Sequence, residues 1–145
     1  MNRRINREKG VITVYEDLIL NRDADELISD NFNDDSDALI SEVFRDREIP
    51  ENDEEDDNED TYILSAVRQA LDNRERYAGY IGRVLEGWTY DRLGEMEKAI
   101  LLMGCAEFDL KQIQAAVIID EYVSLAKKYC DADSYKLING VLDRI

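Results

Sequence analysis

The chain has 145 residues, of which 34 are acidic, 18 are basic and none is histidine, so its formal net charge is −16. This charge argues against a nucleic-acid ligand, and the absence of histidine removes the commonest general base of catalysis at neutral pH. The length fits one compact domain, and a hydrophobic content of 44% is enough for a core. A single proline and seven glycines favour helices over short-strand β architecture.

The negative charge is concentrated in one part of the chain. Residues 1–10 carry four basic and one acidic side chain, residues 11–60 carry three basic and twenty acidic ones, and residues 61–145 carry eleven and thirteen. The run Glu51–Asp60 lacks apolar periodicity and repels itself, so we expect a solvated, poorly ordered loop, with mimicry of nucleic acid as an alternative. Because salt screens charges over about 8 Å, a basic patch on another face can still attract phosphate.

Hydrophobic residues recur at helical spacing along most of the chain, and no stretch alternates convincingly with a period of two. The most apolar segment, Met96–Ala106, is expected to form the central helix of the core. Gly79 and Gly82 are expected to allow the close approach of another backbone. The expected helices cover about residues 4–20, 24–32, 36–47, 62–71, 77–88, 96–106, 117–129 and 134–145.

The expected last helix has a recognisable start and one apolar face. Asp133 or Ser134 suits its N-cap, where a side-chain oxygen accepts a hydrogen bond from a backbone N–H. Lys127 and Lys128 suit the end of the preceding helix, where the helix dipole favours cations. We expect the buried stripe of the last helix to consist of Ile138, Val141, Leu142 and Ile145.

Catalysis and metal binding find little support in the sequence. There is no glycine-rich phosphate loop, and Cys105 and Cys130 have no metal-ligand spacing, so we interpret them as reduced thiols. Asp34–Asp37 lacks the residue order of a calcium loop. The chain has no signal-peptide core and no apolar run of membrane-spanning length. We therefore expect a cytoplasmic, non-enzymatic protein without metal or cofactor; a small enzyme with paired carboxylates is the alternative from another class.

The last quarter of the chain has an unusual residue order, IIDEYVSLAKKYCDADSYKLINGVLDRI at residues 118–145. It resembles the C-terminal signature of the NusB family, which runs approximately I-N-E-A-V-E-L-A-K-K-F-G-x-x-D-S-x-K-F-V-N-G-V-L-D. Weaker matches follow the family's order elsewhere: the arginine-rich opening at residues 3–15, RLGEMEKAIL at residues 92–101, and Ala106-Glu107-Phe108.

This resemblance implies an all-α fold with one NusB-like domain, residues 1–145, made of two packed helical bundles. The first bundle covers about residues 1–75 and includes the acidic loop 49–60; the second covers about residues 76–145. NusB proteins are RNA-binding factors of transcription antitermination. Members bind the single-stranded boxA element of ribosomal RNA leaders together with NusE, a ribosomal small-subunit protein, in the antitermination complex of RNA polymerase.

Two groups of candidate site residues follow from the resemblance and from their chemistry. Four cations within seven residues form a plausible clamp for the RNA backbone, because phosphate contacts need Arg or Lys. Lys136 and Asn139 share one helical face and could donate to a phosphate and a base edge. The candidate RNA-binding residues are Arg3, Arg4, Arg7, Lys9, Asp133, Lys136 and Asn139. The candidate protein-partner residues are Tyr15, Asp91 and Glu97.

Three positions depart from the family pattern. Leu137 replaces an aromatic residue, which could stack on a base for about 1–3 kcal/mol; Leu102 replaces a frequent Arg, and Asp120 replaces Asn. The chain could therefore be a NusB-like paralogue that keeps its protein partner but binds RNA weakly. It could also be a homodimer that covers its own RNA face, or an accessory RNA-binding domain related to that of ribosomal RNA cytosine methyltransferases.

Overall fold

The structure is a computed structural model in which residues 3–20, 28 and 61–145 are described. These residues form six α-helices and a short 3-10 helix, η1, without a strand among them, so the predicted all-α class is confirmed. Apart from Ile28, the helices predicted at 24–32 and 36–47 and the acidic loop at 49–60 lie outside the described residues. The helices are α1 (Arg3–Leu20), α4 (Thr61–Asp72), α5 (Arg74–Val84), η1 (Tyr90–Arg92), α6 (Glu95–Leu110), α7 (Ala115–Tyr129) and α8 (Ser134–Arg144).

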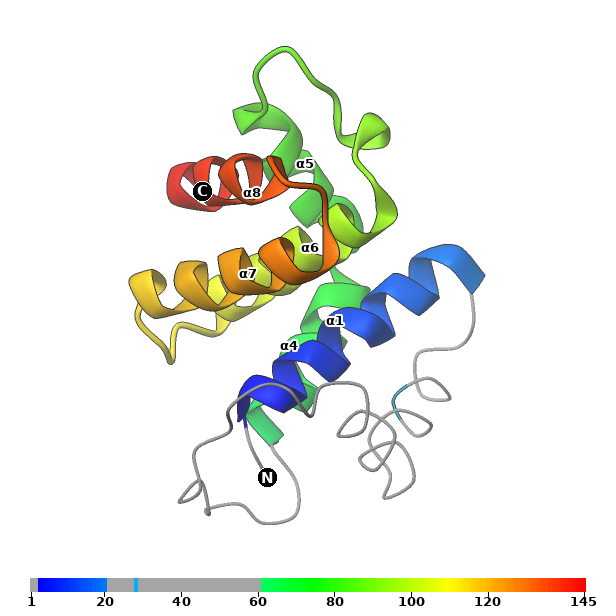
Figure 1. Cartoon of the computed structure of the whole chain (residues 1–145). Coiled ribbons are helices and arrows are strands. Elements are labelled where there is room, and N and C mark those ends of the chain that lie inside the picture. The colour runs from blue at the N-terminus through cyan, green and yellow to red at the C-terminus, as the bar shows by residue number, and fades with distance from the viewer. Residues whose placement is uncertain (1–2, 21–27, 29–60) are drawn as a thin grey trace.

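Helix α6 is the centre of the fold, as its apolar sequence predicted. All nine residues from Ala99 to Glu107 are buried. The helix packs against α1, α4, α5, α7 and α8. Figure 1 shows α1 and α4 crossing on one side of it, while α7 and α8 run antiparallel on the other. A helix covered on all sides needs apolar residues around its whole circumference, and Ile100–Ala106 supplies them.

Two glycines other than the expected pair lie at close contacts with neighbouring helices. A Cβ on Gly10 of α1 would lie 2.8 Å from Met103 Cε, and one on Gly104 of α6 would lie 2.8 Å from Leu142 Cδ2. The prediction for Gly79 and Gly82 was wrong, since among the described residues no atom of another element lies within 4 Å of a Cβ built on either. Both glycines are on the exposed side of α5, a helix that buries only Tyr77 and Ile81.

Helix α5 ends earlier than the apolar spacing predicted. Its last residue is Val84, and Gly87 adopts the left-handed conformation, with a φ of 71°, which glycine reaches without steric cost. The chain changes direction there and returns to the core at Leu93, which is 4% exposed. Trp88, expected within a helix over about residues 77–88, is instead 48% exposed in the loop before η1.

Helix α8 agrees with most of its prediction. Ile138, Val141 and Leu142 are buried, and Lys127 and Lys128 lie in the last turn of α7. The predicted burial of Ile145 was wrong: α8 ends one residue earlier, and Ile145 is 42% exposed. Asp133 occupies the N-cap position, but its side chain makes no capping hydrogen bond.

Candidate functional site

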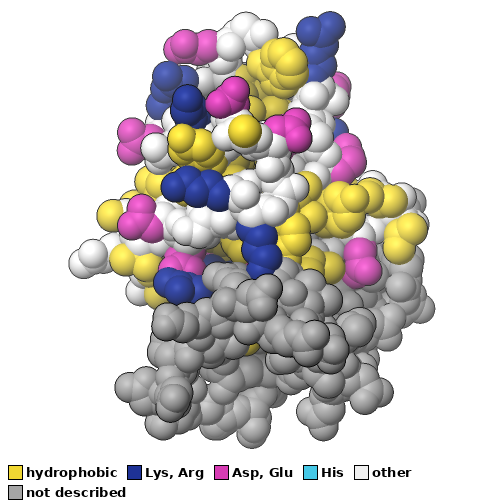
Figure 2. Space-filling view, viewed as in Figure 1, with side chains coloured by type: hydrophobic (Ala, Val, Ile, Leu, Met, Phe, Trp, Pro, Cys, Tyr) yellow, Lys and Arg dark blue, Asp and Glu magenta, His cyan; other side chains and the backbone are white. Residues whose placement is uncertain are grey.

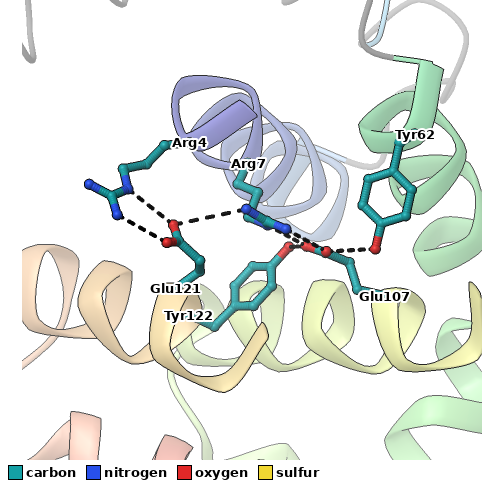
Figure 3. A network of polar contacts seen from close by, with 6 residues as sticks. All are labelled: Arg4, Arg7, Tyr62, Glu107, Glu121 and Tyr122. Atoms are coloured by element: carbon teal, nitrogen blue, oxygen red, sulfur yellow. Dashed lines mark hydrogen bonds and ion pairs between the residues drawn. The ribbon is translucent and has the colours of Figure 1, made fainter. Parts of the chain in front are cut away.

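The start of α1 is fixed on the rest of the molecule by a buried carboxylate, that of Glu107 on α6. The Arg7 guanidinium donates two hydrogen bonds to it, with Nε at 2.7 Å and Nη2 at 2.9 Å. The hydroxyl of Tyr62 on α4 donates a third at 2.8 Å, and that of Tyr122 on α7 a fourth. Figure 3 shows the four side chains converging from four helices, so this network sets the position of α1.

The electrostatics of this network favour a charged arginine and neutral tyrosines. Burial alone lowers the pKa of Arg7, but the hydrogen bonds and negative charge of Glu107 outweigh it and raise that pKa. Burial raises the pKa of Tyr62 and Tyr122, and the neighbouring Glu107 raises both further. Glu107 and Arg7 are 0% and 5% exposed, so water screens their pairing little.

Two further contacts hold the same end of α1 against α7. The exposed Arg4 donates from Nε at 3.3 Å and Nη2 at 3.2 Å to the carboxylate of Glu121. One turn later, the buried Glu8 accepts a hydrogen bond from the Tyr129 hydroxyl at 3.0 Å and lies 3.4 Å from Lys128 Nζ. The first two turns of α1 are thus fixed along the length of α7.

The structure divides the four cations of the predicted clamp into two pairs. Arg3 and Arg4, in the first turn of α1, are exposed, and the Arg3 guanidinium lies over the Tyr62 ring at 4.8 Å from its centroid. Arg7 and Lys9 are buried. Exposed guanidinium groups can reach a phosphate from outside, whereas Arg7 already donates to Glu107. The two pairs therefore have different surroundings, a difference that their spacing in the sequence did not reveal.

The other RNA candidates lie together at the beginning of α8. Asp133, Lys136 and Asn139 are all exposed, and Lys136 Nζ lies 3.7 Å from the Asp133 carboxylate. Nearby, the Lys127 ammonium lies over the ring of the half-buried Tyr135 at 4.9 Å from its centroid. The face that carries the three candidates therefore also carries a cation and an aromatic ring.

The three protein-partner candidates have different surroundings. Asp91 is exposed in η1, and Tyr15 is half-buried on α1. The Glu97 carboxylate accepts hydrogen bonds from the backbone N–H of Gly94 at 2.9 Å and from the Ser134 hydroxyl at 2.5 Å. Glu97 thus caps α6 and ties it to the start of α8.

Sequence reasoning missed Glu107 and Tyr122 as a structural centre, and Lys127 with Tyr135 as a surface pair. One signal was available for Glu107, because a carboxylate within an apolar helical run needs a polar partner. Its partner Arg7 is 100 residues away in the sequence, so spacing could not identify the pair. For Lys127, the sequence indicated only a favourable interaction with the dipole at the end of its helix.

The departures from the family pattern also have clear positions. Leu102 is fully buried in α6, so it occupies a core position and not one on the described surface. Leu137 is half-buried and packs against the hydrophobic core, while Asp120 is exposed on α7. Of these three, Leu137 is the one that borders the face formed by Asp133, Lys136 and Asn139.

Neither a metal site nor a membrane span is found in the part of the chain that the structure describes. No group of three or more acidic or cysteine side chains gathers there as ligands would. No described helix has the length and apolar character to cross a bilayer.

The raised pKa of Tyr62 and Tyr122 predicts a loss of stability in alkali. A tyrosine hydroxyl has a pKa near 10 in the unfolded chain, but in the fold these two stay protonated to higher pH. Their contribution to the stability of the fold is therefore complete below about pH 10 and declines above it. The melting temperature should therefore fall as the pH rises from about 10 to 12, and fall less in Tyr62→Phe, which has no hydroxyl to ionise. Equal pH dependence in the two proteins would contradict this account of the network.

The fold and the site define a class of protein: a small all-α protein whose first helix is firmly fixed and carries exposed arginines at its start. The profile of the NusB family matches residues 23–145. The transcription antitermination protein NusB of Shouchella clausii is 31% identical over 143 residues, which cover 98% of this chain and 92% of that protein. NusB of Sulfurovum sp. is 43% identical over 75 residues, covering 52% and 58% of the two chains. The chain belongs to the NusB family.

Solved structures share the fold of this chain. The NusB of T. maritima superposes with a TM-score of 0.75 at 22% identity, covering 99% of this chain and 89% of that one. A chain from a crystal structure of antitermination factors NusB and NusE in complex with double-stranded RNA superposes with a TM-score of 0.73 at 25% identity, covering 98% and 93%.

Proposed function

We propose that the protein is a transcription antitermination factor that binds boxA-like single-stranded RNA of ribosomal RNA leaders together with NusE. Membership in the NusB family supports this function, and so does the solved relative that was crystallised with NusE and RNA. The protein acts by binding, without catalysis, and within the antitermination complex of RNA polymerase.

The observation that carries the RNA part of the proposal is the fixed pair of exposed arginines at the start of α1. Arg3 and Arg4 are exposed, while the buried ion pair of Arg7 with Glu107 holds the helix below them. A rigid support lowers the entropy that the arginines lose when they bind phosphate. In this proposal Arg3 and Arg4 contact the RNA backbone, and Arg7 acts through the position of α1.

The pairing of Arg4 with Glu121 does not prevent this role. The Arg4 side chain in that pair is 51% exposed, and an exposed ion pair contributes only about 0–1 kcal/mol. A phosphate can therefore replace the carboxylate at small cost. Lys136, Asn139 and Asp133 at the start of α8 are the second proposed RNA contact, with Lys127 beside them.

The alternative with weakened RNA binding rests on Leu137, since Leu102 is buried in the core. The half-buried Tyr135 offers an aromatic ring two residues before Leu137, so we propose that base stacking is retained at this face. A homodimer that covers the RNA face remains the competing proposal, and it predicts that binding of NusE and RNA depends on protein concentration.

A titration of labelled boxA-like RNA in the presence and absence of NusE tests the proposal. We expect the protein to bind the RNA alone and to bind it more tightly when NusE is saturating, because partners that share one complex bind cooperatively. An RNA of the same length with a scrambled sequence is the control. Equal affinity for both RNAs, unchanged by NusE, would contradict the proposed function.

A further inference from the structure

Trp88 is exposed in the middle of a loop whose two ends pack against the core. Residues on both sides pack against the core: Leu85 and Tyr90 are half-buried and Leu93 is buried. Backbone hydrogen bonds from Arg92 to Thr89 and from Leu93 to Tyr90, both 3.0 Å, close the turn after Trp88. The indole is thus presented outward by a defined turn.

The surroundings of Trp88 have the composition of a protein-binding surface. The Arg92 guanidinium lies over the indole at 5.9 Å from the ring centroid, and Trp and Arg are the residues most enriched at the energetic centres of interfaces. Figure 2 shows hydrophobic atoms over this loop at the top of the molecule, with acidic and basic side chains around them. A large apolar side chain with a charged rim is typical of an interface.

The rim of this surface favours a basic partner over RNA. Glu86, Asp91 and Glu95 lie within seven residues of Trp88; Glu86 and Glu95 have their own basic neighbours, Arg144 at 3.6 Å and Lys98 at 2.9 Å. Among the described residues, no basic side chain forms an ion pair with the exposed Asp91. A protein that itself binds RNA phosphates must present Lys and Arg, and these cations complement the acidic rim.

The loop is continuous with the face proposed for NusE. Asp91 lies in the turn that follows Trp88, and Glu97 caps the next helix. Arg74 of α5 forms an ion pair with Asp17 of α1. Arg74 also lies near Tyr90: burial raises the pKa of Tyr90, and the positive charge of Arg74 partly opposes that rise. The second half of α1, which carries Tyr15, therefore lies on the same side as the loop, as Figure 1 also shows.

We infer that Trp88 is the anchor of the NusE interface, with Asp91 and Arg92 as its charged rim. This inference rests on the proposed partnership with NusE. In this inference Trp88 supplies the apolar contact to NusE, and Asp91 faces a cation of that protein. The surface formed by Trp88, Asp91 and Arg92 is separate from Arg3 and Arg4, so NusE and RNA can be bound at the same time.

Trp88 is the sole tryptophan of the chain, so its fluorescence reports on this surface directly. We expect NusE to shift the emission to shorter wavelength and to reduce quenching by acrylamide severalfold. RNA without NusE should change neither. The same measurements on Trp88→Phe, subtracted from those on the wild type, isolate the signal of this residue from any fluorescence of NusE.

Trp88→Ala should weaken NusE binding by about 30-fold, as expected for a central interface anchor, and should leave RNA affinity unchanged without NusE. Val117→Ala, which truncates another exposed apolar side chain, on α7, is the matched control and should bind NusE normally. If the wild type binds NusE while Trp88 stays fully quenchable and Trp88→Ala binds equally well, the inference is wrong. If the wild type does not bind NusE at all, the proposed partnership fails and the inference fails with it.

Discussion

Glu107→Ala is expected to lower the free energy of unfolding by about 3–5 kcal/mol, because it leaves the buried Arg7 guanidinium without its counter-ion. The hydroxyls of Tyr62 and Tyr122 lose their acceptor in the same step. A loss of this size is a large share of the stability of an ordinary domain. Urea unfolding followed by circular dichroism measures it.

Two controls separate the buried ion pair from other effects. Glu121→Ala removes the carboxylate that pairs with the exposed Arg4 and also lies 4.0 Å from the Arg7 guanidinium, but it leaves the hydrogen-bonded Arg7–Glu107 pair in place, so it should cost clearly less than Glu107→Ala. The double variant with Arg7→Met and Glu107→Leu should be more stable than Glu107→Ala, since an apolar pair leaves no buried charge. If Glu107→Ala is no less stable than Glu121→Ala, the network does not fix α1.

Replacing Arg3 and Arg4 together by alanine should weaken binding to boxA-like RNA and reduce its dependence on salt. Each phosphate contact to a single strand contributes about 0.7 to the slope of log affinity against log salt, so losing two contacts should lower the slope by about 1.4. Affinity measured across a series of salt concentrations gives this slope. The stability of the variant should change little, because both side chains are exposed.

The matched control replaces two exposed arginines on other helices, Arg83 of α5 and Arg144 of α8. Their loss removes the same net charge but should leave the slope within about 0.3 of the wild-type value. An unchanged slope in the Arg3 and Arg4 variant would show that these arginines do not contact phosphate. An equal decrease in both variants would show that only the overall charge matters.

The parts of the fold that follow local periodicity were predictable from the sequence. Helix α6 has apolar residues around its circumference, and α8 has one apolar stripe, so their burial follows from spacing alone. The end of α5 was not predictable in this way. The apolar spacing continues to Trp88, but Gly87 allows the chain to turn first, and that turn decides which side Trp88 faces.

The sequence showed where the candidate cations lie, but not which of them are exposed and which are buried. Cations near the start of the chain pointed to α1, and the exposed Arg3 and Arg4 fit that expectation. The burial of Arg7 depends on Glu107, which the fold alone brings within 2.7 Å. Glu97 similarly depends on Ser134, 37 residues away. Partners so distant in the sequence leave no periodic signal.

The measurement that tests the central claim most directly is terminator read-through in a reconstituted transcription reaction that contains NusE and the other antitermination factors but no NusB. Addition of this protein should raise read-through on a template whose transcript carries boxA, and should have no effect when boxA is scrambled. The variant lacking Arg3 and Arg4 should give less read-through at the same concentration. Read-through that stays at its starting level on the boxA template, with the folded protein and NusE both present, would contradict the assignment as an antitermination factor.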